Sequence, residues 1–377
     1  MVKIALYGAG NLGKYVLSEL EKQNLYEPII FIDNFVSGQS WSRRGLKIVN
    51  LEIFKKEWEA ECDAVIICAE NKINKQSMTL SLLPWFNKDI FLPSEHILSA
   101  KLPLFNEKGD FCTYVKKYTE EKPILSYVEH DLTKFCNLKC KNCGHRSDEV
   151  KSIIKSDRKV FIQSLEGLRK IFSNIYQIRL MGGEPFVLDD LDWYVDTARG
   201  FFEESEIDIV TNGLLIPNVN EEILLAIKKN NINVQISQYP PTRKMIEKIV
   251  YKLEQAGVKY QISSPILKFM ERRENYEYVN KIESIYRNCP NYHCHTMSDG
   301  RLFGCGIIKE LIERDGDKVN NKLLLENSID LINPKISGWD ALILLERANT
   351  LCGYCFEEQN WVNWESLNKN YNLYYKQ

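Results

Sequence analysis

Residues 132–145 read Leu132-Thr133-Lys134-Phe135-Cys136-Asn137-Leu138-Lys139-Cys140-Lys141-Asn142-Cys143-Gly144-His145. Three thiolates in so short a loop can bind three irons of a cubane. The fourth iron then has no protein ligand, and an open metal position is what a substrate or cofactor needs in order to bind. The polar residues between the cysteines argue against a core segment with three structural thiols. The stretch therefore predicts a cluster on Cys136, Cys140 and Cys143.

Zinc is the alternative metal for part of this loop. Cys140-x-x-Cys143 has the spacing of half a zinc site, with Cys352-x-x-Cys355 as its distant companion.

The loop lies in a region, residues 121–285, that alternates strand and helix signals. Strands are expected at Leu125–Leu132, Gln177–Met181, Ile207–Thr211, Asn233–Ser237 and Lys259–Ser263. Helices are expected between them, at Arg158–Asn174, Leu191–Glu204, Asn220–Asn230 and Thr242–Gln255. Repeated βα units predict a parallel sheet with right-handed crossovers, too short for a closed eight-stranded barrel. The chemistry of such sheets sits at the carboxyl ends of the strands, where the cysteine loop falls.

The pattern Cys-x-x-x-Cys-x-x-Cys after an apolar strand resembles the radical SAM superfamily. The resemblance implies a partial (β/α)6 barrel and a [4Fe–4S] cluster whose open iron is chelated by S-adenosylmethionine (SAM). It also implies reductive cleavage of SAM to a 5′-deoxyadenosyl radical, which takes a hydrogen atom from the substrate. The cofactors carry this chemistry, while the protein positions and shields them. The family often has an aromatic residue before the third cysteine, where this chain has Asn142.

A second motif, Met181-Gly182-Gly183-Glu184-Pro185, follows the next expected strand. Glycines permit close approach of the backbone to a ligand. In the family this turn binds the amino group of SAM, which assigns Gly182, Gly183, Glu184 and Pro185 to the SAM site. Thr211-Asn212-Gly213 and Ser237 also lie at strand ends, where the family places polar contacts to SAM. For each of these, a helix cap or turn residue is an equal alternative.

The last segment, residues 286–377, holds five cysteines: Cys289, Cys294, Cys305, Cys352 and Cys355. The segment resembles the twitch, or shortened SPASM, extension of radical SAM enzymes, which implies a small domain with an auxiliary [4Fe–4S] cluster on four cysteines. Spacing to Gly300 favours Cys289, whereas a two-residue turn at Asp299-Gly300 places Cys294 directly opposite Cys305. Both stay open, as does a structural zinc site.

The first segment, residues 1–105, reads as a Rossmann-like α/β unit. Gly8-x-Gly10-x-x-Gly13 follows a strand and opens a helix, the context of a nucleotide phosphate site. Asp33, at the end of the second strand, is placed to hold a ribose hydroxyl. The segment resembles the N-terminal domain of sugar O/N-acetyltransferases, which implies a nucleotide-sugar ligand. One alternative is a redox NAD site, which is disfavoured because a segment of about 105 residues has room for only one of the two mononucleotide-binding halves. The other is a docking domain that binds no ligand. Ser99–Thr113 is expected to be a linker.

Composition bounds the remaining choices. The 377 residues carry a net charge of −2, with 44% hydrophobic and 27% charged residues, so bulk charge gives no case for nucleic acid. No stretch approaches the ~18 apolar residues of a membrane span, and the start has no secretory signal. We expect a cytoplasmic protein with thiols rather than disulfides and with no nucleic-acid or membrane partner.

Three functions fit these observations. The first is a radical SAM enzyme that modifies a nucleotide-activated sugar of surface-polysaccharide synthesis or a similar small molecule, reduced by a partner such as flavodoxin or ferredoxin. The second is a peptide-modifying radical SAM maturase, against which the N-terminal glycine turn argues. The third is a non-catalytic zinc or iron–sulfur scaffold, which predicts no 5′-deoxyadenosine on reduction with SAM.

Overall fold

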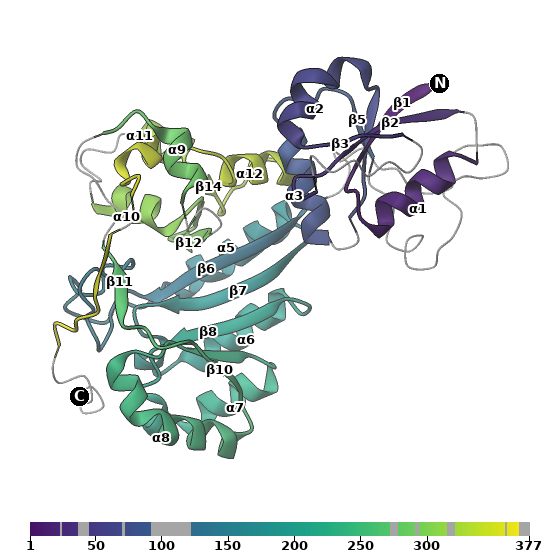
Figure 1. The fold of residues 1–377 in the computed structure, drawn as a ribbon. Coiled ribbons are helices and arrows are strands. Elements are labelled where there is room, and N and C mark those ends of the chain that lie inside the picture. The colour runs from purple at the N-terminus through teal and green to yellow at the C-terminus, as the bar shows by residue number, and fades with distance from the viewer. Residues whose placement is uncertain are drawn as a thin grey trace. The chain divides into compact units, whose positions relative to one another are not determined.

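A computed structural model describes residues 1–22, 25–36, 45–69, 72–91, 122–271, 278–289, 291, 294–314, 321–358 and 360–368. The chain divides into two compact units, Met1–Ile124 and Leu125–Gln377 (Figure 1). The expected linker at 99–113 lies outside the described residues. In the described parts, no helix has both the length and the apolar character that crossing a membrane requires.

The first unit is a five-stranded parallel sheet in the order β3-β2-β1-β4-β5. Its strands are β1 (Val2–Tyr7), β2 (Tyr26–Ile32), β3 (Ile48–Val49), β4 (Ala64–Ile67) and β5 (Asp89–Phe91). Its helices are α1 (Asn11–Leu20), α2 (Leu51–Glu57), the 3-10 turn η1 (Glu59–Glu61) and α3 (Lys72–Leu82). This confirms the α/β reading of the segment and its first strands and helix.

Both faces of this sheet are apolar. Ile4 and Leu6 pack on one side with Val16 of α1, whereas Ala5 and Tyr7 pack on the other side with Phe54 of α2. Side chains alternate between the faces of a strand, so a strand covered on both sides reads as a continuous apolar run.

The second unit contains an eight-stranded sheet in the order β10-β9-β8-β7-β6-β12-β13-β14. Its first five strands are β6 (Ile124–Thr133), β7 (Asn174–Gly182), β8 (Glu206–Thr211), β9 (Asn233–Ile236) and β10 (Lys259–Ile262). The helices between them are α5 (Arg158–Ile171), α6 (Leu191–Phe201), α7 (Glu221–Lys229) and α8 (Pro240–Ala256). β7 through β10 pair in parallel, so the expected βα alternation is confirmed.

Local signals set the ends of these helices. The Asp157 carboxylate accepts from the Val160 backbone N–H at 2.9 Å and caps α5. α8 begins with Pro240 and ends at Gly257, whose φ of 67° is left-handed. Two 3-10 turns, η2 (Pro185–Val187) and η3 (Ile216–Asn218), follow β7 and β8.

The last part of the chain extends the same sheet. β12 (Thr296–Ser298) pairs in parallel with β6 and antiparallel with β13 (Arg301–Phe303), which pairs with β14 (Ser328–Asp330). Asp299 and Gly300 form the predicted two-residue turn, with φ of 46° and 76°. Because these strands share a sheet with β6–β10, the division into separate 121–285 and 286–377 domains stays a prediction.

The remaining elements surround this extension. They are α9 (Ile282–Arg287), α10 (Gly306–Arg314), α11 (Asn321–Glu326), α12 (Gly338–Leu345) and the 3-10 turn η4 (Thr350–Tyr354). A separate two-stranded ribbon joins β11 (Lys268–Met270) to β15 (Trp361–Asn363), so the C-terminal part of the chain runs back beside residues of the barrel (Figure 1).

Candidate active site at the carboxyl ends of β6, β7 and β8

The cysteine loop begins where β6 ends. Cys136 and Cys140 are buried and Cys143 is half-buried. Burial raises the pKa of Cys136 to about 12, with a smaller contribution from Cys143, and it raises that of Cys140 beside Cys143 and Cys136. The three thiols are therefore neighbours, and a metal that binds here must displace the protons of Cys136 and Cys140.

The backbone of this loop is unusual. Lys139, Asn142 and Arg146 all have positive φ, of 48°, 63° and 51°. Asparagine tolerates this left-handed conformation, but for lysine and arginine it is uncommon. Such conformations persist only where the surrounding structure fixes them, and they collect at functional sites.

The thiols fit an iron–sulfur cluster in chemistry and surroundings. Leu138 and Leu214 pack against them, and Tyr239, Phe269 and Trp364 add aromatic surface, so the site is screened from water. Across the described residues, no three or more His, Cys, Asp or Glu side chains close around a single ion. A cubane is larger than an ion and holds its thiolates further apart, so neighbouring but separate thiols suit it.

The Gly182-Gly183-Glu184-Pro185 turn packs directly against this loop. The backbone N–H groups of Gly183 and Glu184 donate to the carbonyls of Thr133 and Phe135, at 2.6 and 2.9 Å. A Cβ at Gly183 would lie 2.0 Å from the Phe135 carbonyl oxygen. The second glycine is thus required by close approach of two backbones.

Glu184 is fully buried and holds three donors. Its carboxylate accepts from the Thr211 hydroxyl at 2.7 Å and from the backbone N–H groups of Asn212 at 2.8 Å and Phe186 at 3.1 Å. Burial nevertheless raises its pKa to about 7. Three hydrogen bonds leave part of the accepting capacity of a carboxylate for a further donor such as an ammonium group.

Two asparagines connect this turn to the thiols. The Asn212 side chain donates to Asn137 Oδ1 at 2.7 Å, and its Nδ2 lies 3.7 Å from Cys136 Sγ. Sequence reasoning missed Asn137 and placed Asn212 only among the residues expected to contact SAM, because an asparagine beside a motif carries no signal of its side-chain partners.

Of the other residues predicted for the SAM site, the structure brings Thr211 into contact with Glu184 and gives Ser237 and Pro185 structural contacts. The Thr211 hydroxyl donates to the Glu184 carboxylate. The Ser237 backbone N–H donates to the Thr211 carbonyl at 2.8 Å and so connects the ends of β8 and β9. Pro185 begins η2. Their contacts to SAM stay predictions.

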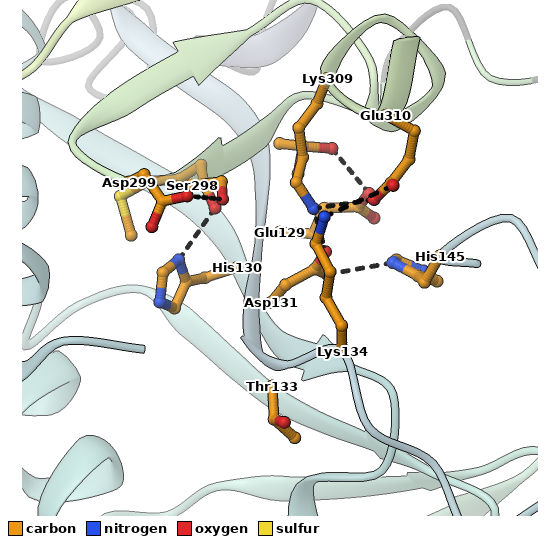
Figure 2. Close-up of polar contacts among 12 residues, drawn as sticks. Glu129, His130, Asp131, Thr133, Lys134, His145, Ser298, Asp299, Lys309 and Glu310 are labelled. Atoms are coloured by element: carbon orange, nitrogen blue, oxygen red, sulfur yellow. Dashed lines mark hydrogen bonds and ion pairs between the residues drawn. The ribbon is translucent and has the colours of Figure 1, made fainter. Parts of the chain in front are cut away.

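A buried charged network lies on the polar face of β6, beside the loop (Figure 2). Lys309 of α10, which is 1% exposed, is ion-paired with Asp131 and contacts Glu310 at 3.1 Å. The Asp131 carboxylate also meets His145 Nδ1 at 3.0 Å. Burial opposes the charges, but Lys309 and His145 outweigh it and hold the pKa of Asp131 well below its usual value.

Glu129 and His130 lie on opposite faces of β6, because successive side chains of a strand alternate. Glu129 shares the face of Asp131, accepts from Thr296 and Tyr127 at 2.8 and 2.9 Å, and has a pKa raised by burial. His130 instead contacts the Met297 carbonyl and the Ser156 hydroxyl, each at 2.9 Å, toward helix α5. His130 is structural, and Glu129 faces the interior.

The five C-terminal cysteines fall into two environments. Burial raises the pKa of Cys305, with further contributions from its neighbours Cys355, Cys289 and Cys352. Burial raises the pKa of Cys294 to about 11, and its charged neighbours are Glu129 and Arg179, with Cys289. The hairpin register from Thr296↔Phe303 to Ser298↔Arg301 is the one predicted, and Cys289 is a neighbour of both Cys305 and Cys294.

The first unit carries a pocket of about 700 Å³ beside the glycine turn. The pocket is lined by Gly8, Gly10, Asp33 and Asn34 and, from α3, by Ser77 and Ser81. Gly13 lies beneath the turn, where a Cβ would come within 2.0 Å of the Gly8 carbonyl oxygen. The Ala9 backbone N–H donates to the Asp33 carboxylate at 3.0 Å, so Asp33 also orders the turn.

The second unit thus has three thiols after one strand of its sheet and a Gly-Gly-Glu-Pro turn after the next. Residues 131–300 match the family model of the radical SAM superfamily. The chain thus carries the domain of a radical SAM enzyme, with the type of reaction left open.

Curated proteins similar to this chain include the GTP 3′,8-cyclase of Aliarcobacter butzleri. It is 23% identical over 171 residues, which are 42% of this chain and 52% of that protein. The GTP 3′,8-cyclase of Clostridium perfringens is 25% identical over 175 residues, 44% of this chain and 53% of that protein. The chain therefore spans about half the length of the curated relatives it matches.

Similarity to solved structures is weak. BtrN in complex with AdoMet and 2-DOIA has a TM-score of 0.36 and 17% identity, covering 63% of this chain and 97% of that one. At this level the likeness carries no argument about function.

Proposed function

We propose that this chain holds a [4Fe–4S] cluster on Cys136, Cys140 and Cys143, binds SAM beside Gly182–Pro185, and acts on a small nucleotide-bearing substrate. When bound, the cluster and SAM supply the radical chemistry. The observation that carries the proposal is the chain of contacts from Glu184 through Asn212 and Asn137 to Cys136. It joins the ends of β7 and β8 to the loop after β6.

The residues of the chain have defined tasks in this proposal. Glu184, oriented by Thr211 and Asn212, is placed to accept from the amino group of SAM. The aromatic and aliphatic wall around the thiols excludes water. Glu129 and Arg179, near Cys294, give the interior polar groups that a small polar substrate needs.

An auxiliary site on Cys289, Cys305, Cys352 and Cys355 belongs to the proposal, as a twitch-like feature. Its support is that Cys305 has the other three thiols as neighbours. Cys294 is then the spare cysteine and faces the interior. Iron–sulfur and zinc are both compatible with four thiolates, and metal analysis separates them.

A nucleotide site in the first unit completes the proposal. Its sheet order, β3-β2-β1-β4-β5, is that of the first five strands of a Rossmann fold, and the glycine turn opens α1 on the pocket. The curated relatives are named for a nucleotide, GTP, which agrees with a nucleotide-bearing substrate. The relatives named above give no support to the expected role in polysaccharide synthesis.

The test is anaerobic reconstitution of the whole chain, followed by metal and sulfide analysis and by reduction in the presence of SAM. We expect iron and sulfide, about eight irons per chain if both sites hold cubanes, and 5′-deoxyadenosine by mass spectrometry. Cys143→Ala should abolish 5′-deoxyadenosine, whereas Cys62→Ala, in the core of the first unit, should not. Zinc alone, or no 5′-deoxyadenosine, would refute the proposal.

The substrate class is tested separately. Nucleotides and nucleotide-sugars are screened for stabilisation of the chain against heat and for an increase in 5′-deoxyadenosine release. A peptide-modifying enzyme would respond to neither set.

A further inference from the structure

A C-terminal segment lies along the cysteine loop. Residues 361–368, called the strap here, begin with β15 and then run antiparallel to the loop. The Lys141 backbone N–H donates to the Glu365 carbonyl at 2.9 Å, and the Leu367 N–H donates to the Lys139 carbonyl at 3.0 Å. These two bonds form an isolated β-bridge between Cys140 and Ser366.

Two side chains of the strap add to this bridge. The Ser366 hydroxyl donates to the Leu138 carbonyl at 2.5 Å, and the Asn368 side chain donates to the Asn137 carbonyl at 2.6 Å. The loop is irregular, so its backbone groups need partners outside itself. The strap supplies partners for the carbonyls of Asn137, Leu138 and Lys139 and for the N–H of Lys141.

Trp364 of the strap reaches the sulfur itself. Its indole Nε1–H donates to Cys140 Sγ at 3.2 Å. Its ring is stacked on Tyr239, with centroids 5.7 Å apart and planes at 23°, and its backbone N–H donates to the Leu267 carbonyl at 2.9 Å. The donor is therefore held in place by its neighbours rather than by the sulfur alone.

We propose that Trp364 is a positioning residue that donates a hydrogen bond to the Cys140 thiolate of the bound cluster and thereby raises its reduction potential. The inference rests on the proposed function. Reduction adds negative charge to a cluster, and a fixed donor on a thiolate ligand stabilises the more negative state. An indole has only a donor and cannot accept, so its orientation toward sulfur is unambiguous.

The alternative is that Trp364 only packs against the loop. Trp364→Phe separates the two roles because phenylalanine keeps an aromatic ring beside Tyr239 and lacks the N–H. Ser366→Ala removes a hydrogen bond between the strap and the loop but keeps the Trp364 indole N–H that donates to Cys140. Trp361→Phe, at an exposed position of β15, is the matched control for removal of an indole.

The experiment is an anaerobic redox titration of the reconstituted proteins, monitored by electron paramagnetic resonance. It uses a background with both Cys352→Ala and Cys355→Ala, which leaves the auxiliary site too few thiols for a cubane, so that only the first cluster reports. We expect Trp364→Phe to shift to a lower potential than the parent, up to a tenfold change in the ratio of reduced to oxidised cluster, or 59 mV. Trp361→Phe and Ser366→Ala should keep the parent potential, while Ser366→Ala loses iron faster to a chelator.

The outcomes are distinguishable from failure of the proposed function. If the parent binds no cluster, the proposed function fails. If the parent binds one and Trp364→Phe titrates with it, or if Ser366→Ala shifts as far, the inference about Trp364 is wrong. The titration is repeated without the Cys352→Ala and Cys355→Ala changes, to check that they do not themselves shift the potential of the first cluster.

Discussion

At the scale of single residues, burial decides the charge of Glu184. Its pKa is about 7, although three donors contact it. As pH rises from 4.5 to 7, an unfolded chain loses this proton while the folded chain keeps it, so stability falls over that range, by about 3 kcal/mol. Glu184→Gln has no charge to bury. We expect the midpoint of thermal unfolding of the variant apoprotein to rise relative to the wild type between pH 4.5 and 8.

The comparison is made at each pH, so that other titrating groups cancel. Parallel curves for the two proteins would show that Glu184 is ionised throughout and that its donors outweigh burial.

Two glycines of the first unit are predicted to behave in opposite ways. Gly10 has φ of −69° and no atom within 4 Å of a Cβ position, whereas a Cβ at Gly13 would meet the Gly8 carbonyl oxygen. Gly10→Ala should therefore keep the fold, at a cost of at most about 1 kcal/mol. It should weaken nucleotide binding at least ~10-fold, because its methyl group stands between a phosphate and the start of α1.

Gly13→Ala should lower thermal stability even without nucleotide. Calorimetric titration and thermal unfolding of both variants check the pair. Equal loss of stability in the two variants, or full nucleotide affinity in Gly10→Ala, would contradict the assignment of this pocket.

Individual site residues were predictable from sequence only where a motif fixes them. The three cysteines and the Gly-Gly-Glu-Pro turn have local spacing, and spacing is visible in the chain. Lys309 and Asp131 are 178 positions apart, and Trp364 and Cys140 are 224 positions apart. No periodicity links such pairs, so only the fold reveals them.

At the scale of elements, the contact between two loops is set by a glycine. Gly183→Ala would drive a methyl group into the Phe135 carbonyl and part the turn from the cysteine loop. We expect a loss of about 1–3 kcal/mol or more and a matching loss of bound iron after reconstitution. Gly200→Ala, in helix α6 with no atom within 4 Å, is the control and should stabilise the protein by about 0.4–1 kcal/mol.

Thermal unfolding and iron content are measured on both variants. Iron content equal to the wild type in Gly183→Ala would mean that the two loops need not touch.

Long elements were predicted well, whereas short ones were predicted only where a turn marks them, as at Asp299-Gly300 between β12 and β13. The five strands from β6 to β10 and the helices between them have clear apolar periodicity, and their bounds agree within a few residues. β11, β14 and β15 have three residues each, too few for a period to show. These short strands form because each pairs with a neighbouring strand: β11 with β15, and β14 with β13.

At the scale of the whole molecule, the sequence suggested a boundary near residue 286 because the βα alternation stops there. The alternation does stop, but β12 pairs with β6, which began more than 160 residues earlier. A change in local pattern therefore marks a change in connection rather than an end of the sheet.

We predict that residues 122–285 do not form a stable domain without the rest of the unit. Their separation leaves β6 with an open edge and removes three buried partners: Met297 from His130, Thr296 from Glu129 and Lys309 from Asp131. Loss of one partner of a buried ion pair alone costs about 3–5 kcal/mol, against a typical domain stability of about 5–15 kcal/mol.

The fragment should therefore lack a cooperative thermal transition and bind a dye for exposed apolar surface, whereas residues 122–377 should unfold cooperatively. Lys309→Met in the longer fragment isolates the ion pair, and Asp131→Asn with Lys309→Met should recover part of its loss, because the buried charge is then gone. A cooperative transition in the short fragment would instead establish residues 286–377 as a separate domain that merely docks on β6.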